Sequence, residues 1–406
     1  MNLYIADLHT HSCFSRATSK DMTIPNMAFW ARKKGISLLS SADFTHPQWL
    51  EHLRQHLKPT NKRGIFSYDG VEFVLGCEVS NIFSRKDVSK RTYRVHSLIY
   101  CPCFEDVEAV NRYLSSFGSL NSDGRPMLGL DVADMCAAIK RISPDSFVCF
   151  AHIWTPWYSL FGSRSGFDSM QEAFPDGVPD NVIALETGLS SDPRMNRMCS
   201  FLDEFRLFSN SDAHSPMNLG REANVFEIEP DFYELKAILR DKKGQRFKET
   251  IEFFPEEGKY HYDGHRECGV CLHPKETLAD RGLCPVCGRP LTIGVLNRVW
   301  TLKDKEENRI SDKARYIVPL VELISFVKAK GKAAKTVLAE YEKIVGLVPE
   351  LKLLLYEDLE NYIGRINNDV LSLIKNMREG RVEIKPGCDG VYGKVEIERP
   401  LQGLFA

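Results

Sequence analysis

The sequence lacks several features that would assign it to a specialised class of protein. No apolar run reaches the roughly 18–20 residues needed to span a bilayer, and Met1–Asp7 lacks the basic region and long apolar stretch of a signal peptide. Cysteine is sparse, with 12 in 406 residues, which argues against a secreted disulfide framework. A formal net charge of −2 gives no global nucleic-acid signature. We expect a cytoplasmic protein with no membrane segment, in which any nucleic-acid site is a local patch.

The composition and length predict a folded protein of two or three domains. Hydrophobic residues make up 43% and charged residues 27%, which is ordinary for a soluble globular protein, and 406 residues exceed the usual single domain. Oligomeric state has no signal here, and a monomer is favoured. Changes in composition divide the chain into an α/β segment at 1–240, a segment with clustered Cys and His at 241–305, a helical segment at 306–380 and a Gly-rich hairpin at 381–406.

Up to about residue 240, short β-rich runs alternate with amphipathic, helix-like stretches. The runs are rich in Val, Ile, Leu and Phe, and such alternation is typical of a parallel α/β sheet or barrel. The predicted strands are Leu3–Ala6, Ile36–Ser40, Phe73–Leu75, Val95–Tyr100, Phe147–Phe150, Val182–Leu185 and Arg206–Phe208. The predicted helices are Asn26–Lys34, Glu105–Phe117, Asp131–Ile142 and Met195–Glu204.

Polar side chains that can bind metals recur just after these strands, where barrel enzymes and open α/β sheets keep their active sites. Residues i and i+2 of a strand point to the same side, so His9 and His11 can reach one metal, and Asp212 and His214 repeat the spacing. Asp7 could be a ligand or could orient an imidazole. A single histidine here would be unremarkable, but the whole set favours a metal site. Its other members are Asp43, His46, Glu78, His96, His152 and Glu186.

The ordered motif set in residues 1–240 resembles the polymerase-and-histidinol-phosphatase (PHP) family. The first motif of the family resembles Asp7-Leu8-His9-Thr10-His11-Ser12. Its last motif resembles Asp212-Ala213-His214. The resemblance implies a distorted seven-stranded β/α barrel with two to three divalent ions (zinc, magnesium or manganese) and phosphoesterase activity. His9, His11, Glu78 and Asp212 would hold the first ion and carry the catalysis, and Glu78, His96 and His152 would hold the second. His214 and a ligand from Asp43–His46 would hold a third, although Phe44 replaces the usual histidine.

Two CxxC pairs follow the barrel, Cys268–Cys271 and Cys284–Cys287, separated by twelve residues. Four thiolates from two such pairs make a closed tetrahedral zinc site, here predicted as a four-cysteine ribbon. A redox CxxC and free thiols are the alternatives, and Gly269 and Gly288 suit the turns of zinc knuckles. We expect His265 and His273 to be bystanders.

Basic and aromatic residues outside these motifs are candidates for DNA contact. Lys330, Lys332 and Lys335 surround a break between two predicted helices, where backbone phosphates could bind; a solvated helix pair is the alternative. Trp154 and Trp157 follow His152 and could form a stacking wall for an extruded base, or could be core residues. The remaining candidates are Arg164 near this wall, and Arg16 and Lys20 in the loop after the first motif.

A PHP barrel followed by a CxxC ribbon, a helical segment and Asp389-Gly390-Val391-Tyr392-Gly393-Lys394 resembles the endonuclease Q family over nearly the whole chain. The resemblance implies a DNA-repair endonuclease that flips a damaged nucleotide and cleaves on its 5′ side. The damage would be a deaminated base (uracil, hypoxanthine, xanthine) or an abasic site. The alternatives are a small-molecule phosphatase of the histidinol-phosphate kind and a non-catalytic DNA-binding scaffold.

Overall fold

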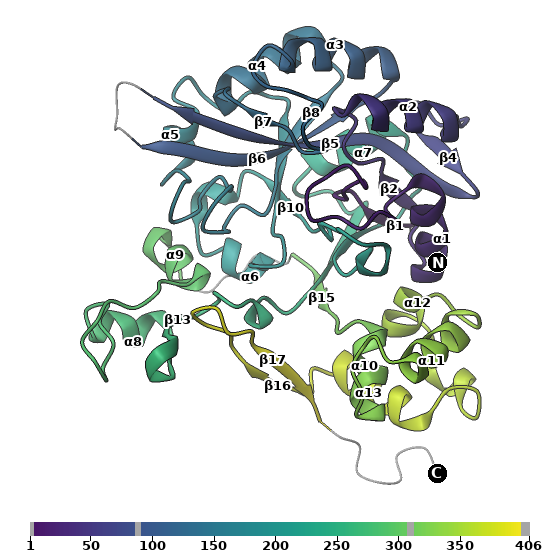
Figure 1. Ribbon diagram of the computed structural model, residues 1–406, viewed down its shortest axis with the longest axis vertical. Coiled ribbons are helices and arrows are strands. Elements are labelled where there is room, and N and C mark those ends of the chain that lie inside the picture. Colours follow the sequence, from purple (N-terminus) through teal and green to yellow (C-terminus); the bar gives the residue numbers. More distant parts are fainter. Residues whose placement is uncertain (1–3, 86–90, 307–311, 399–406) are drawn as a thin grey trace.

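The computed structural model describes residues 4–85, 91–306 and 312–398. Leu3 of the first expected strand and residues 399–406 of the expected C-terminal hairpin lie outside this part of the chain. Figure 1 shows a large sheet with flanking helices above, and smaller units below it. None of the helices in the described part is long and apolar enough to cross a membrane.

Among the described residues, a 13-stranded sheet is built mainly from the N-terminal two thirds of the chain. Its main path runs in the order β10-β9-β8-β6-β5-β2-β1-β11-β12-β15, and all seven expected strands belong to it. The ten strands of this path are β1 (Tyr4–Asp7), β2 (Leu38–Ser40), β5 (Val71–Ser84), β6 (Thr92–Cys101), β8 (Phe147–Phe150), β9 (Val182–Glu186), β10 (Arg206–Phe208), β11 (Ala223–Phe226), β12 (Phe247–Glu252) and β15 (Ala314–Tyr316). The short strands β3 (Lys58–Pro59), β4 (Phe66–Tyr68) and β7 (Met127–Leu128) lie beside this path.

The sheet is mixed rather than wholly parallel, which corrects the expectation from the sequence. Parallel pairing joins β1 to β2, β2 to β5, β8 to β9 and β9 to β10. Antiparallel pairing joins β5 to β6, β6 to β8 and β1 to β11. The connection between β5 and β6, from Ser84 to Thr92, is too short for the helical crossover that parallel neighbours need.

The sheet curls into a half-barrel, and side chains bridge the ends of β10 and β1. Asn224 on β11 donates to the carbonyl of Ser209 (2.7 Å) and to Oδ1 of Asn210 (2.9 Å), and its own Oδ1 accepts from the Ser209 amide (3.0 Å). Asn210 Oδ1 also accepts from the amide of Leu8 (2.8 Å). Amide side chains therefore provide the hydrogen bonds between these two parts of the sheet.

Amphipathic helices cover the sheet and bury their apolar residues against it. They are α1 (Ile24–Lys34), α2 (Pro47–His56), α3 (Phe104–Leu114), α4 (Val132–Ile142), α5 (Met170–Ala173), α6 (Pro193–Asn196) and α7 (Phe232–Arg240). The expected helix Met195–Glu204 is instead broken into α6 and a 3₁₀ turn at Ser200–Leu202. Buried Arg197 accounts for the break, because its guanidinium donates to the carbonyls of Leu202 and Phe205.

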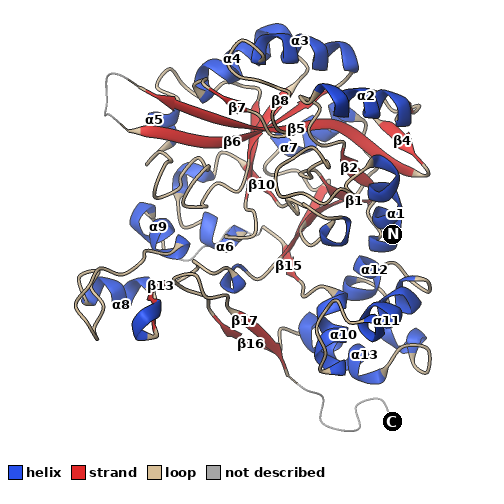
Figure 2. Ribbon diagram, viewed as in Figure 1, coloured by secondary structure: helices blue, strands red, loops and turns tan. Residues whose placement is uncertain are grey.

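The C-terminal third forms three smaller units, which Figure 2 distinguishes by secondary structure. The first contains β13 (Asp263–His265), β14 (Val270–Leu272), α8 (Pro274–Ala279) and α9 (Val295–Leu302). The second is a helical unit of α10 (Leu320–Lys328), α11 (Lys335–Val345), α12 (Glu350–Leu355) and α13 (Asn368–Arg378). The third is the expected hairpin, β16 (Val382–Lys385) paired antiparallel with β17 (Lys394–Ile397).

Candidate metal centre

Two groups of potential metal ligands meet at the end of the sheet where β1, β8 and β10 finish. The first consists of His9, His11 and Asp212, and the second of Glu78, His96 and His152. Within each group, the ligand atoms lie within 4.8 Å of one another. His9 and His11 follow β1, His152 follows β8 and Asp212 follows β10, whereas Glu78 lies within β5 and His96 within β6.

Glu78, on β5, lies between the two groups. Its Oε1 is 2.8 Å from His96 Nδ1 and 3.3 Å from His152 Nε2. The same oxygen is 3.6 Å from His9 Nε2, while Oε2 is 3.3 Å from His11 Nε2. A carboxylate placed in this way can share its two oxygens between two cations.

The donor atoms of the centre fit divalent cations. His9 Nε2, His11 Nε2 and Asp212 Oδ1 are buried and make no hydrogen bond with good geometry. Buried polar atoms are otherwise almost always paired, and imidazole nitrogens with carboxylate oxygens are ligands for zinc, manganese and related ions. Although burial opposes ionisation, His96, Arg125 and His9 hold the pKa of Glu78 well below its ordinary value, so this carboxylate is ready to bind a cation.

Two carboxylates orient the histidines of the first group from behind. Glu186 at the end of β9 places both oxygens 3.1 Å from His9 Nδ1 and accepts from the His152 amide (2.8 Å). Asp43 lies 3.2 Å from His11 Nδ1 and accepts from the amide and hydroxyl of Ser12 (both 2.6 Å). Partners of this kind fix the ring and direct its other nitrogen at the metal.

The backbone at this centre has unusual torsion angles. Asp43, His152 and Asp212 have φ angles of 37°, 29° and 47°, a region that residues other than glycine rarely adopt. Such conformations cost free energy and gather at functional sites. A Cβ on Gly124 would lie 2.4 Å from Asp43 Oδ2, so only glycine allows the 123–125 segment to pass this close.

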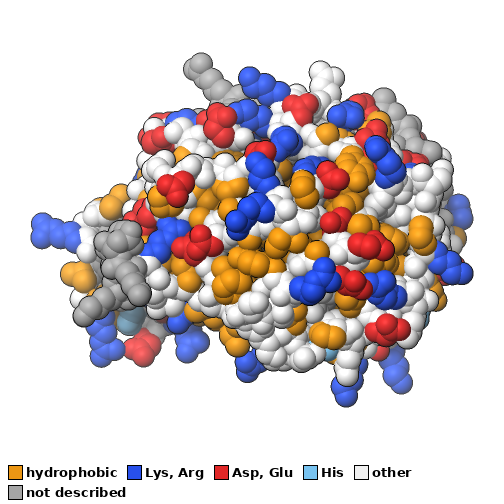
Figure 3. All heavy atoms as spheres, turned by 90° about the horizontal axis from the view of Figure 1, so that it is seen from above, with side chains coloured by type: hydrophobic (Ala, Val, Ile, Leu, Met, Phe, Trp, Pro, Cys, Tyr) orange, Lys and Arg blue, Asp and Glu red, His pale blue; other side chains and the backbone are white. Residues whose placement is uncertain are grey.

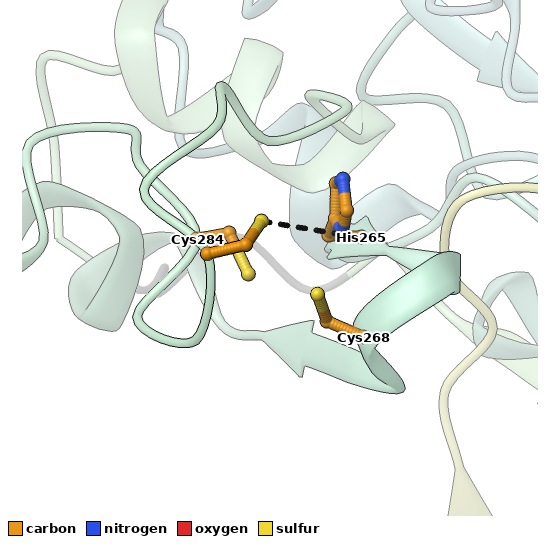
Figure 4. Close-up of side chains that lie close together, drawn as sticks. His265, Cys268 and Cys284 are labelled. Carbon is orange, nitrogen blue, oxygen red and sulfur yellow. Dashed lines mark hydrogen bonds between the residues drawn. The ribbon is translucent and has the colours of Figure 1, made fainter.

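A third ligand group, outside the barrel, combines one histidine with three cysteines: His265, Cys268, Cys284 and Cys287. Figure 4 shows Cys284 across from His265 and Cys268, which come from one continuous segment. His265 Nδ1 lies 3.9 Å from Cys287 Sγ. The expected set of four cysteines is therefore corrected at one position.

Cys271 is the expected ligand that lies elsewhere, because it forms a disulfide with Cys388. Cys271 is on β14, whereas Cys268 precedes the left-handed turn at Gly269. His265, at the end of β13, takes the fourth place in the cluster and is not the bystander that the sequence suggested.

The two tryptophans that follow His152 differ in exposure. Trp154 is fully buried and its Nε1 donates to Asn196 Oδ1 (2.8 Å), so it is a core residue and not a stacking wall. Trp157 is 50% exposed, and the Arg164 guanidinium lies 6.0 Å from its ring centroid. Trp157 and Arg164 therefore keep the surface position that DNA contact would need.

The expected basic contacts are exposed but lie in different places. Arg16 and Lys20 are on the loop after the first motif, and the amide of Ser19 in this loop donates to the carbonyl of His214 (2.8 Å). Lys330, Lys332 and Lys335 lie at the α10–α11 connection, where Lys332 pairs with Glu322 (2.8 Å). On the face seen in Figure 3, basic and acidic side chains are interspersed, as the net charge of −2 suggests.

No family model matches the sequence. Two curated relatives are both described as uncharacterized proteins. MJ0043 of Methanocaldococcus jannaschii is 32% identical over 256 residues, which are 60% of this chain and only 31% of that protein, so this chain spans about a third of its length. YqxK of Bacillus subtilis is 28% identical over 417 residues, which cover 98% of this chain and 100% of that protein.

Solved structures match the whole fold. The lesion-specific endonuclease PfuEndoQ from Pyrococcus furiosus superposes with a TM-score of 0.86 at 30% identity, over 97% of this chain and 95% of the other. This chain belongs to the endonuclease Q family. A second member, endonuclease Q in complex with a 27-mer duplex that has an abasic lesion at the active site, has a TM-score of 0.83 at 30% identity, over 98% and 97% of the two chains.

In this endonuclease Q family member, sequence reasoning missed the role of two charged residues. Glu186 was noted only as a strand-end carboxylate, although it orients His9. Arg125 gave no signal, because its segment belongs to no predicted strand or motif. Its Nη1 lies 2.9 Å from Glu78 Oε2, so it places a positive charge next to this candidate ligand.

His214, Asp43 and His46, which the sequence suggested as ligands of a third metal ion, do not form a ligand group within the described residues. His214 lies close to His11, with ring centroids 4.5 Å apart. The Asp43 carboxylate is hydrogen-bonded to His11 and Ser12. The His46 ring stacks on the Phe14 ring, with the ring centroids 4.4 Å apart. The expected third metal position in this endonuclease Q fold stays a prediction. Asp7 is no ligand in these groups either, because it accepts from Ser211 and Gly220.

Proposed function

We propose that this chain is a metal-dependent DNA-repair endonuclease that hydrolyses the phosphodiester on the 5′ side of a deaminated base or an abasic site. Its partner would be damaged DNA, whose lesion nucleotide is flipped toward the metal centre. The observation that carries the proposal is the pair of buried ligand groups joined by Glu78, in a chain of the endonuclease Q family. One family relative is a lesion-specific endonuclease, and another binds duplex DNA with an abasic lesion at its active site.

The ligand sets divide between two ions of a PHP-type centre. His9, His11 and Asp212 would hold the first ion, and His96 and His152 would hold the second. Glu78 would bind both ions. Divalent ions in such a pair lower the pKa of a bound water and stabilise negative charge on phosphate oxygens. His9 Nε2, His11 Nε2 and Asp212 Oδ1 are gathered in a buried place and make no hydrogen bond with good geometry, which supports this assignment.

The protein's own side chains position the substrate around these ions. Arg125 lies against Glu78, and its side chain keeps 22% of its surface exposed, so its guanidinium can donate to a phosphate oxygen of the scissile bond. Trp157 offers a half-exposed indole on which a base can stack. Glu186 and Asp43 hold His9 and His11 in place while the phosphate changes its geometry.

The His265-Cys268-Cys284-Cys287 cluster would hold a structural zinc, since thiolates and imidazole are the ligands of closed tetrahedral zinc sites. Such an ion would fix the turns around β13 and β14, where little apolar surface is buried. The basic residues Lys330, Lys332 and Lys335 on the α10–α11 connection would contact the DNA backbone at a distance from the chemistry.

A nicking assay tests the function. Labelled duplexes carrying one uracil or one abasic site, and a fully matched duplex, are incubated with magnesium or manganese and with a chelator. We expect a metal-dependent nick immediately 5′ to the lesion, leaving a 3′-hydroxyl and a 5′-phosphate, and little cleavage of matched DNA.

The matched variant is His9→Ala with His11→Ala, which should retain the fold by circular dichroism but lose the nick. Equal cleavage of matched and damaged duplexes would contradict the assignment to DNA repair but would still show that the protein is a nuclease. Hydrolysis of a small phosphomonoester without any nicking would favour the phosphatase alternative. Full activity of the double variant would show that the proposed centre is not the active site.

A further inference from the structure

The side-chain amide of Asn210 makes contacts on both sides of the candidate ligand His9. Its Oδ1 accepts from the amide of Leu8, the residue before His9 (2.8 Å). Its Nδ2 donates to Oε1 of Glu186 (2.8 Å), and this carboxylate oxygen lies 3.1 Å from His9 Nδ1. Asn210 therefore holds the backbone that leads into His9 and also the carboxylate that orients its ring.

These groups are withdrawn from solvent. Asn210 and Glu186 are fully buried, and only 1% of His9 is exposed. Water cannot replace a lost hydrogen bond in such a place, so two donors or two acceptors that face each other stay unsatisfied. An asparagine side chain offers a donor and an acceptor at once, whereas an ionised aspartate offers acceptors alone. The position of Asn210 thus requires both functions of an amide.

The direction of the Asn210 amide is fixed by a second asparagine, Asn224 on β11. Asn224 Oδ1 accepts from the Ser209 amide (3.0 Å), and its Nδ2 donates to the Ser209 carbonyl (2.7 Å). Because a backbone N–H and carbonyl cannot exchange places, these two bonds determine which end of the Asn224 side chain carries the nitrogen. The same Nδ2 donates to Asn210 Oδ1 (2.9 Å), so Asn210 must turn its own Nδ2 toward Glu186.

Glu186 receives this orientation and passes it to His9. Its Oε1 accepts from Asn210, and its Oε2 accepts from the His152 amide (2.8 Å). With a donor fixed on each oxygen, the carboxylate cannot rotate away from His9 Nδ1, from which both oxygens lie 3.1 Å. A ring held at Nδ1 in this way directs its Nε2 at a cation.

Asn210 also lies where the two ends of the curled sheet meet. His9 and His11 follow β1, whereas Asp212 comes two residues after Asn210, beyond the end of β10. The bond between Asn210 and the Leu8 amide therefore joins the two chain segments that supply the first ligand group. A change at Asn210 would alter both the spacing of these segments and the direction of the His9 ring.

We propose that Asn210 is a positioning residue of the first ligand group and that it sets the affinity of this group for a divalent cation by directing Glu186 at His9. Asn210 offers no atom to the cation and acts through Glu186. The assignment rests on the proposed function, because it takes His9, His11 and Asp212 as ligands of a metal centre.

A reciprocal exchange of two side chains tests this role. Asn210→Asp places two carboxylates face to face, and Glu186→Gln leaves an N–H of the glutamine facing another donor, either Asn210 Nδ2 or the His152 amide. The double variant has one donor and one acceptor again, with the total charge of the wild type. The glutamine nitrogen can donate to the new carboxylate while the glutamine oxygen accepts from the His152 amide and His9 Nδ1.

Isothermal titration of the full-length, metal-depleted protein with manganese, without DNA, measures the affinity. His9→Ala identifies the part of the titration that belongs to the first ligand group, because it removes a ligand. We expect each single variant to weaken this binding by roughly 10–100-fold. The double variant should bind manganese about tenfold more tightly than Asn210→Asp, because the exchange restores the contact.

Asn181→Asp is the matched control. Asn181 is buried like Asn210, its Nδ2 donates to the carbonyl of Cys136 (2.9 Å), and it lies at the opposite end of β9 from Glu186. The same substitution here should lower the urea midpoint of unfolding without changing the manganese affinity. If Asn181→Asp weakens manganese binding as much as Asn210→Asp does, the effect reflects a general loss of stability and the proposal is overturned.

Two other results would overturn the role of Asn210. These are wild-type affinity in Asn210→Asp, and a double variant in which the losses of the two single variants multiply. A wild-type protein that binds no manganese at this group would contradict the metal centre, and the role of Asn210 with it. Manganese binding with the expected pattern, but no nicking of a damaged duplex, would contradict the proposed function and leave the role of Asn210 in place.

Discussion

Glu186 is the residue on which the first ligand group depends most, although it offers no atom to the proposed metal. Its two oxygens accept hydrogen bonds from His9 Nδ1, the His152 amide and Asn210 Nδ2. We expect Glu186→Gln to weaken metal binding by roughly 10–100-fold, because His9 loses the carboxylate that fixes its tautomer and ring position. Isothermal titration of the metal-free protein with manganese measures this. Glu51→Gln is the control, since this exposed carboxylate of α2 accepts from Gln55 and should leave the affinity nearly unchanged.

Glu252 gives a second prediction at the residue scale. It is fully buried and accepts from Ser209 Oγ (3.1 Å), yet its Oε1 has no partner. Burial raises its pKa from the ordinary 4.5 to about 8. The protonated side chain therefore contributes stability that is fully present below about pH 4.5 and is lost as the pH rises through about 8.

Glu252→Gln should reduce this dependence, at roughly 1.4 kcal/mol per unit of difference between the folded and unfolded pKa, while buried Glu222, whose pKa is also raised, still titrates. Urea unfolding from pH 5 to 9 at constant metal saturation should show the wild type losing stability relative to the variant as the pH rises. If the unfolding free energies of the wild type and the variant change with pH in the same way, the pKa of Glu252 is not raised in the folded protein.

At the scale of elements, the cysteine unit makes the sharpest comparison between sequence and structure. We expect His265→Ala and Cys284→Ser to lose about one equivalent of zinc, because each removes a ligand from the cluster, and Cys271→Ser to retain it. Metal analysis after dialysis against a chelator measures the content. The opposite result, with zinc lost from Cys271→Ser and kept by His265→Ala, would restore the four-cysteine set that the spacing predicted.

Elements and ligands that depend on local pattern were predictable from the sequence, and those that depend on long-range packing were not. All seven predicted strands exist, because buried β-rich runs carry their own signal. Strand direction was not readable for β5 and β6, whose antiparallel pairing follows from a short connection. Arg125 lies 47 positions from Glu78 in sequence and has no periodic pattern around it, so only the fold brings them together.

At the scale of the whole molecule, one buried ion pair fixes the helical unit to the barrel. Lys34 of α1 lies 2.7 Å from Glu350 of α12, with both side chains at most 3% exposed, and Glu350 also accepts from Tyr341 (2.7 Å). Lys34→Met leaves a buried, uncompensated carboxylate, which we expect to cost about 3–5 kcal/mol. Limited proteolysis should then release α10–α13 while the barrel retains its metal.

The neighbouring pair provides the control. Lys33→Met removes a contact with Glu342, whose side chain is 50% exposed, and should cost less than about 1 kcal/mol. If both variants resist proteolysis like the wild type, the helical unit is held by its apolar contacts alone.

The amide bridge at Asn224 has a consequence for the ageing of the molecule. Its Nδ2 donates to two oxygens at the junction of the sheet, Ser209 O and Asn210 Oδ1. Hydrolysis of this one side-chain amide would exchange a donor for an anionic oxygen facing those two acceptors, and attraction would become repulsion. The fold of a protein proposed to recognise deaminated bases thus depends on an amide that the same hydrolytic chemistry can destroy.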